Sequence, residues 1–345
     1  MDRPPPALTP PGAGWMLRGM NLRLLSLLAV LTIPGLWAAS SAFAEVKKDP
    51  GKKPPSGPAA EAVKDAKEGK LPDYIRYAES PEAVKLEIAI KTFTLPTGQK
   101  VDLMGVVHIA DKPYYDELNK RFDAYDAVLF ELVGNPKRLT ENAPPTEEEQ
   151  RHRPGGGAIS GIQGAMSKYL KLSFQLGAID YTKPNMVHAD TTAEEFEKMQ
   201  KERGESMMTL FMRAMRAQLT GEIDNTVAGE LDMIGLIRIL MSQDSAAEFK
   251  KILARMFDQA ESMTAILEGP QGSAILTGRN DVVMKKIREV LADKKKHRIA
   301  VFYGAAHMPG IERMMLKDMK ATAAGEEWLS AWTMPGAKPV EKKKP

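Results

Sequence analysis

An apolar strand, a short amphipathic helix and a second apolar strand follow one another in this chain, and this pattern constrains the fold most. Val101–Val107 and Ala127–Leu132 are apolar runs of strand length. Between them, after a predicted N-cap at Asp111, apolar residues recur at helical spacing. Two strands joined by a helix run parallel in one sheet and are expected to be neighbours. The sequence therefore predicts an α/β fold with a central, mostly parallel sheet flanked by helices.

The same alternation returns near the C-terminus. Val283–Leu291 has helical periodicity, Ile299–Tyr303 is a fully apolar strand, and Ile311–Met319 is expected to be a further helix. Trp328–Trp332 adds a possible edge strand. Ahead of the first unit, the alternating residues of Val84–Phe93 predict a strand.

The middle of the chain interrupts this pattern. Residues 134–160 are polar and rich in Pro and Gly, which predicts a mobile insertion. Met186–Ala189 is expected to form a short strand, and Thr191 with Glu194 is the expected capping box of the next helix. Residues from about 192 to 268 are typical of a largely helical cap.

The N-terminal segment has the features of a secretory signal peptide. Arg18 and Arg23 precede the apolar run Leu24–Ala39, and Ala42–Ala44 fits a cleavage site. We therefore expect residues 1–44 to be a signal peptide and the protein to be periplasmic or extracellular. The alternative is an uncleaved membrane anchor, although the run is short for a membrane span.

Composition limits the remaining possibilities. Residues 45–75 are predicted to be a disordered linker, residues 76–335 the α/β domain, and residues 336–345 a disordered tail. The formal charge of +3 is small, and the lysine runs are typical of solvated surface, so we expect no nucleic-acid partner. Because there is no cysteine, a metal would need His and carboxylate ligands.

Three residues that can bind a metal follow or end apolar strands: His108, Glu131 and His307. Both histidines lie in Gly-x-x-His sequences, which start at Gly105 and Gly304. Ligands collect at the carboxyl ends of strands in open α/β sheets. Two neutral imidazoles and a carboxylate can hold a divalent ion and leave positions open for water. The alternative is a structural role for all three side chains.

Two further residues lie after a predicted strand. His188 and Asp190 leave Met186–Ala189 and could face the same site. They are candidates for supporting the ligands from behind, or for supplying a general base. A purely structural histidine is the alternative.

Four blocks of sequence resemble the signatures of the TraB/Tiki superfamily, which includes TraB/GumN-like proteins. They are Leu103–Ala110, Asp126–Val133, Gly278–Met284 and Val301–Ile311. The resemblance covers the α/β parts of the chain and implies a fold shared with erythromycin-esterase-like and ChaN-like proteins.

The resemblance also implies chemistry. In Tiki members, two Gly-x-x-His motifs, an acidic residue and an arginine serve a metal-dependent protease activity. Carried over, these are His108, His307, Glu131 and Arg279, with manganese, cobalt or zinc as the metal. Arg279 begins a predicted helix, where the dipole disfavours a cation. Its guanidinium could hold a substrate carboxylate or an oxyanion, or it could pair with Asp281 or Glu131.

The leading hypothesis is a metal-dependent hydrolase, expected to be a peptidase acting on a peptide or small-molecule substrate. One alternative is a non-catalytic haem- or metal-binding protein with Tyr114 and Tyr115 as candidate axial ligands. The other is a metal-free esterase with His108 or His188 as base. The sequence has no Gly-x-Ser-x-Gly elbow, Walker loop or dinucleotide fingerprint.

Overall fold

The structure is a computed structural model that describes residues 73–140, 169–206, 244–268 and 272–336, with a few isolated positions between 206 and 244. The predicted signal peptide, nearly all of the linker, most of the insertion at 134–160 and the tail beyond 336 lie outside the described residues. Much of the predicted helical cap does so too.

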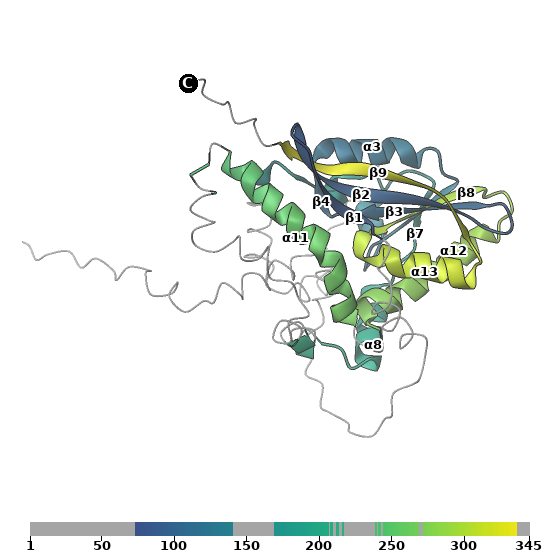
Figure 1. The fold of residues 1–345 in the computed structure, drawn as a ribbon. Helices are drawn as coiled ribbons and strands as arrows, with labels where there is room; N and C mark the ends of the chain where they lie inside the picture. Colours follow the sequence, from purple (N-terminus) through teal and green to yellow (C-terminus); the bar gives the residue numbers. More distant parts are fainter. Residues whose placement is uncertain are drawn as a thin grey trace, which may run out of the picture.

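One seven-stranded mixed sheet forms the centre of the molecule (Figure 1). Its strands are β1 (Ile75–Glu79), β2 (Ala83–Thr94), β3 (Lys100–Val106), β5 (Ala127–Phe130), β7 (Met186–His188), β8 (Arg298–Gly304) and β9 (Thr322–Pro335). A separate two-stranded ribbon joins β4 (Ile109–Ala110) to β6 (Ser173–Phe174). The chain is therefore an α/β protein, as predicted.

The strands β3, β8, β5 and β7 run parallel in that order, and β1, β2 and β9 add antiparallel pairings at the other side. The first strand–helix–strand unit is parallel as expected, but its two strands are not neighbours. The later strand β8 lies between β3 and β5 and pairs with both. Its continuous burial fits that central position.

Two features of the sheet were not predicted. β1 precedes the first predicted strand and pairs with the first half of β2. β9 is far longer than the predicted edge strand and follows β2 along its whole length, with two register irregularities. Because β9 has many small and polar residues, its first half lacks the apolar alternation by which strands are recognised.

The helices are α3 (Lys112–Phe122), α4 (Lys137–Thr140), α7 (Gln175–Ala178), α8 (Ala193–Glu202), α11 (Ser245–Glu268), α12 (Arg279–Leu291) and α13 (Met308–Asp318). A π-helix, η4 (Ala274–Gly278), precedes α12, and a 3-10 turn, η5 (Ala305–His307), precedes α13. Within the described ranges, no helix is long and apolar enough to cross a membrane.

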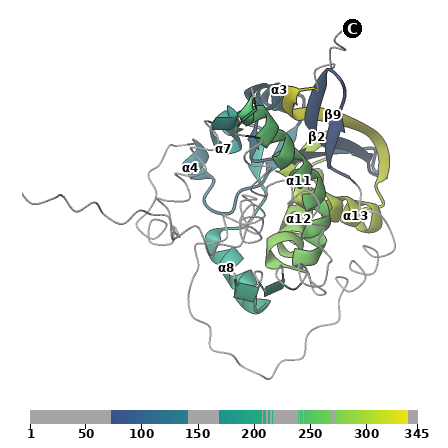
Figure 2. The ribbon, with the colours of Figure 1, turned by 60° about the vertical axis from the view of Figure 1, so that its left-hand side comes forward.

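Helices cover both faces of the sheet. Figure 1 shows α3 on one side and α11, α12 and α13 on the other, while α8 lies away from the sheet in both views (Figures 1 and 2). The capping box of α8 is one residue later than predicted, because Thr192 rather than Thr191 accepts the N–H of Glu195.

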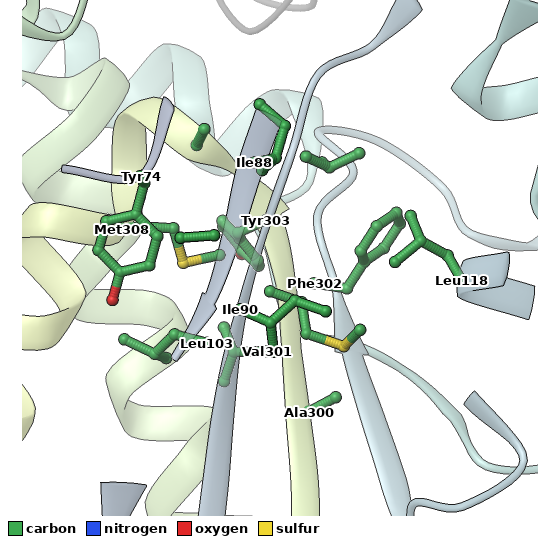
Figure 3. Close-up of a cluster of buried hydrophobic side chains, with 14 of the residues drawn as sticks. Tyr74, Ile88, Ile90, Leu103, Leu118, Ala300, Val301, Phe302, Tyr303 and Met308 are labelled. Atoms are coloured by element: carbon green, nitrogen blue, oxygen red, sulfur yellow. The ribbon is translucent and has the colours of Figure 1, made fainter. Parts of the chain in front are cut away.

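The core fills the space between the sheet and the helices on each side. Tyr74, Leu103 and Met308 pack on one face of the central strands, and Leu118 lies with Phe302 on the other (Figure 3). All five are fully buried. Burial of apolar area on both faces makes the parallel strands rigid, so they fix the positions of the residues that follow them.

Candidate functional site

The carboxyl ends of the four parallel strands meet at one edge of the sheet. His108 follows β3, His307 follows β8 by way of η5, Glu131 follows β5, and Asp190 follows β7. Because β8 is central, His307 lies between the other two predicted ligands. The order along the edge is therefore His108, His307, Glu131 and Asp190.

Arg279 links the residues at this edge. Its Nε donates to Asp190 Oδ1 at 2.9 Å, and its Nη2 donates to Glu131 Oε1 at 2.6 Å and also to Asp190. Its Nη1 lies 3.3 Å from His307 Nε2. The guanidinium is 1% exposed, so its charge is balanced by these carboxylates and not by water.

The position of Arg279 differs from the expected helix start. The π-helix η4 runs directly into α12, and Ser273 caps this continuous segment by accepting the N–H of Leu276. Arg279 therefore lies more than one turn inside the helical segment, where an opposing dipole no longer applies. Of the two interpretations open from the sequence, the ion pair with Glu131 is observed.

The space beside Gly304 shows how closely the predicted ligands approach one another. A Cβ built on Gly304 would lie 3.1 Å from Glu131 Oε2, 3.7 Å from His108 Nε2 and 3.8 Å from His307 Cδ2. The Gly304 N–H also donates to Glu131 Oε2 at 2.5 Å. Glycine at this position therefore leaves room for three functional side chains to converge.

Each histidine of the cluster is held through Nδ1 by a side-chain amide. His307 Nδ1 lies 2.8 Å from Asn280 Oδ1, and His108 Nδ1 lies 2.7 Å from Gln175 Oε1. His307 is buried, whereas His108 is half-buried. Of the convergent side chains, His108 is the one that reaches solvent.

Burial and charge set the protonation of the buried members. Burial raises the pKa of Glu131, but the Arg279 guanidinium, the neighbouring histidines and the Gly304 N–H together outweigh it and hold that pKa well below its ordinary value. Burial lowers the pKa of His307 to about 4. Burial also lowers the pKa of Arg279, yet Glu131 and Asp190 raise it above its ordinary range. Near neutral pH, the site thus holds an ionised Glu131, a charged Arg279 and a neutral His307.

The two candidate residues His188 and Asp190 have different contacts, and within the described chain only Asp190 binds a residue of the cluster. Asp190 joins the cluster by binding Arg279 through both carboxylate oxygens. His188 instead bonds through Nε2 to the Leu132 carbonyl at 2.7 Å and packs against Phe130. These contacts give His188 a structural role beside the cluster.

The candidate haem ligands are engaged elsewhere. Tyr114 donates its hydroxyl to the Gly105 carbonyl at 3.1 Å, and Tyr115 donates to the Val107 carbonyl at 2.8 Å. Both side chains are buried, and burial raises the pKa of each hydroxyl. This geometry does not favour axial ligation of haem by either residue.

The predicted divalent metal fits the arrangement poorly. Arg279 contacts Glu131 Oε1 and His307 Nε2, and the Gly304 N–H donates to Glu131 Oε2. The atoms that a metal would need as ligands therefore already have other partners. Among the residues the structure describes, no group of three acidic or histidine side chains has a metal-binding arrangement. A guanidinium this close also repels a dication. The metal stays a prediction of the family resemblance.

Three residues of the site were not found from the sequence. Gln175 and Tyr181 lie in a stretch with no motif, and Tyr181 accepts a hydrogen bond from Gln175 Nε2 at 3.0 Å. Asn280 directly follows Arg279 inside a block that resembles a family signature. That position could have indicated Asn280, whereas only the fold brings Gln175 to His108.

No protein-family model and no curated protein matches this chain. The resemblance to the TraB/Tiki superfamily therefore stays a prediction.

Proposed function

We propose that the protein is a hydrolase that cleaves a carboxylic ester or amide with a water molecule activated by His108, without direct participation of a metal. The observation that carries this proposal is the position of His108. Its ring is half-buried, its Nδ1 is occupied by Gln175, and its Nε2 lies near Glu131 beside Gly304. An imidazole that has Nδ1 anchored, leaves Nε2 to accept a proton and has a carboxylate nearby is suited to general base catalysis.

In the proposed reaction, His108 Nε2 removes a proton from water as the water attacks the substrate carbonyl. The imidazolium that forms is stabilised by the negative charge of Glu131, whose Oε2 lies on the same side of Gly304. The proton then passes from His108 to the leaving alcohol or amine. The same residue thus acts first as base and then as acid.

Arg279 and Asp190 support this reaction from behind. Burial raises the pKa of Glu131, but Arg279 is the largest of the contacts that together hold this pKa well below its ordinary value, so Glu131 stays ionised in a buried position. Asp190 in turn holds the guanidinium in place, because its carboxylate accepts from Nε and Nη2 of Arg279. Arg279 and Asp190 are positioning residues in the proposed mechanism, because their polar atoms bind each other and Glu131.

The charge of the cluster favours a neutral substrate. Three nitrogens of Arg279 are already engaged by Asp190, Glu131 and His307, so no open fork remains for a phosphate or carboxylate. Two carboxyl groups also face this one guanidinium. A peptide or a small neutral ester therefore fits better than a phosphoester.

The test compares hydrolysis of p-nitrophenyl esters and peptide anilides by the wild type and by His108→Gln. Removing the base is expected to lower kcat by about 10²- to 10⁴-fold. His297→Gln is the matched control, because His297 is exposed and lies at the amino end of β8. It should keep wild-type activity.

The same assay after dialysis against a chelator tests the role of metal. Activity is expected to survive chelation and to gain little from added manganese, cobalt or zinc. Loss on chelation with recovery on metal addition would overturn the metal-free mechanism in favour of the metal-dependent one. Equal kcat for His108→Gln and the wild type would overturn the role of His108.

A further inference from the structure

The ribbon of β4 and β6 places Gln175 opposite His108. Ile109 pairs with Phe174 and Ala110 pairs with Ser173, so the next antiparallel step aligns His108 with Gln175. The Gln175 N–H donates to the His108 carbonyl at 2.8 Å, which continues the ladder. Opposed residues of an antiparallel pair present their side chains on one face.

The side chains of this pair are bonded, and the bond is protected from water. Gln175 is 2% exposed, and its Oε1 lies 2.7 Å from His108 Nδ1. Its Nε2 donates to the Tyr181 hydroxyl at 3.0 Å. Tyr181 is itself buried and packs against Phe130 at the end of β5, with ring centroids 5.0 Å apart.

We infer that Gln175 fixes His108 in the tautomer with its proton on Nδ1. This inference deepens the proposed function, on which the catalytic part of it rests. A neutral imidazole carries one proton on either nitrogen, and the partner of Nδ1 decides which. An amide oxygen accepts only, so it requires N–H at Nδ1 and leaves a lone pair at Nε2.

The orientation of the Gln175 amide matters, because its two ends have opposite hydrogen-bonding roles. An amide turned by half a rotation would offer NH₂ to Nδ1 and move the proton to Nε2, which would block Nε2 as a base. In the observed arrangement, the amide oxygen faces His108 Nδ1 and the Tyr181 hydroxyl oxygen accepts from the amide nitrogen. Gln175 is therefore a positioning residue, and it adds no charge to the site.

The tautomer can be measured directly by NMR of protein labelled with ¹⁵N-histidine, at a pH where His108 is neutral. The His108 signals are identified by their loss in His108→Gln. The wild type is expected to show His108 protonated on Nδ1. His188 is an internal reference for the tautomer with its proton on Nε2, because that nitrogen must donate to the Leu132 carbonyl oxygen.

Variants of the amide should change the position of the His108 proton in a defined way. Gln175→Leu removes the acceptor, so the proton should move mainly to Nε2. Gln175→Glu keeps an acceptor oxygen and should keep the proton on Nδ1.

The matched control is Asn185→Ala. Asn185 is an amide whose Nδ2 donates to the Phe122 and Tyr125 carbonyls, away from His108. Its loss should lower the melting temperature and leave the His108 tautomer unchanged. If Gln175→Leu does not fold, the wild-type protein still decides the question, because a His108 proton on Nε2 would overturn the inference.

Kinetics give the second readout. Gln175→Leu should lower kcat by about tenfold or more with little change in KM, and Gln175→Glu should restore most of kcat. An Nε2-protonated His108 in the wild type, or no change of tautomer in Gln175→Leu, would overturn the inference. If the tautomers follow the expected order but no substrate is cleaved, the proposed hydrolysis fails and the role of Gln175 stands.

Discussion

Buried carboxylates bind an arginine at both ends of the parallel strands, and the two ends differ in how the arginine meets solvent. At the amino end, Asp102 is fully buried and its Oδ2 accepts from Tyr125 and, at 2.6 Å, from Arg298. The Arg298 side chain is 47% exposed and lies over the Tyr125 ring. Water therefore still solvates much of its charge.

At the carboxyl end, the arginine has no such contact with water. Arg279 is 1% exposed and depends on Glu131 and Asp190 for its charge balance, with neutral His307 against it. Desolvating an ion in this way costs several kcal/mol unless partners compensate. The comparison suggests that the amino end is a structural clamp, whereas the carboxyl end keeps a costly arrangement that a purely structural role does not require.

The largest difference between the two ends should appear when each arginine is removed. Arg279→Met leaves two buried carboxylates without their cation, so it should lower the free energy of unfolding by about 3–5 kcal/mol. Arg298→Met should cost less, about 1–3 kcal/mol, because it leaves one buried carboxylate, Asp102, which keeps its hydrogen bond from Tyr125. Urea unfolding of both variants measures the difference, and equal losses would contradict the contrast between the ends.

The second prediction is that stability depends on pH through His307, at the carboxyl end of the strands. Burial lowers the pKa of His307 to about 4 from 6.5, so the unfolded chain binds more protons between these values. Stability is therefore present above the unfolded pKa and lost as the pH falls toward the folded one. The loss is on the order of 3 kcal/mol.

Urea unfolding at several pH values within this window measures that loss. His307→Asn should flatten the dependence on pH, while Arg298→Met should keep the wild-type slope. A wild-type stability that stays constant across the window would contradict the buried, neutral state of His307.

A smaller effect is expected from filling the space beside Gly304. In Gly304→Ala, the new Cβ would lie 3.1 Å from Glu131 Oε2 and displace it, which should cost about 1–3 kcal/mol of stability and lower kcat. Gly325→Ala in β9 is the control, since its Cβ would meet Thr92 at an ordinary 3.9 Å. Thermal unfolding and the hydrolysis assay should separate the two variants.

The smallest effect is expected at His188. His188→Ala loses one hydrogen bond to the Leu132 carbonyl, a loss of about 1 kcal/mol, and should leave kcat near the wild-type value. A loss of activity comparable to that of His108→Gln would instead make His188 the base. Parallel assays of the two variants decide between these histidines.

Local sequence patterns predicted the strands and the side chains that follow them. Apolar periodicity located β2, β3, β5 and β8 closely, because each buries a regular run of side chains. The carboxyl-end rule for parallel strands then identified His108, Glu131 and His307 as residues of one edge. These results depend on neighbours in the chain, so the sequence alone contains them.

The tertiary structure decided how those residues are used. β8 comes nearly 200 residues after β3 in the chain yet inserts beside it, since sheet order depends on packing between distant segments. The same long-range packing brings Asp190 to Arg279 and Gln175 to His108. It also makes Arg279 a buried ion-pair partner of Glu131, which was one of the two interpretations that the sequence left open. The sequence by itself determined that His108, Glu131 and His307 lie at one edge of the sheet. Only the fold determined their hydrogen-bond partners, because Gln175, Asp190 and Arg279 come from distant parts of the chain.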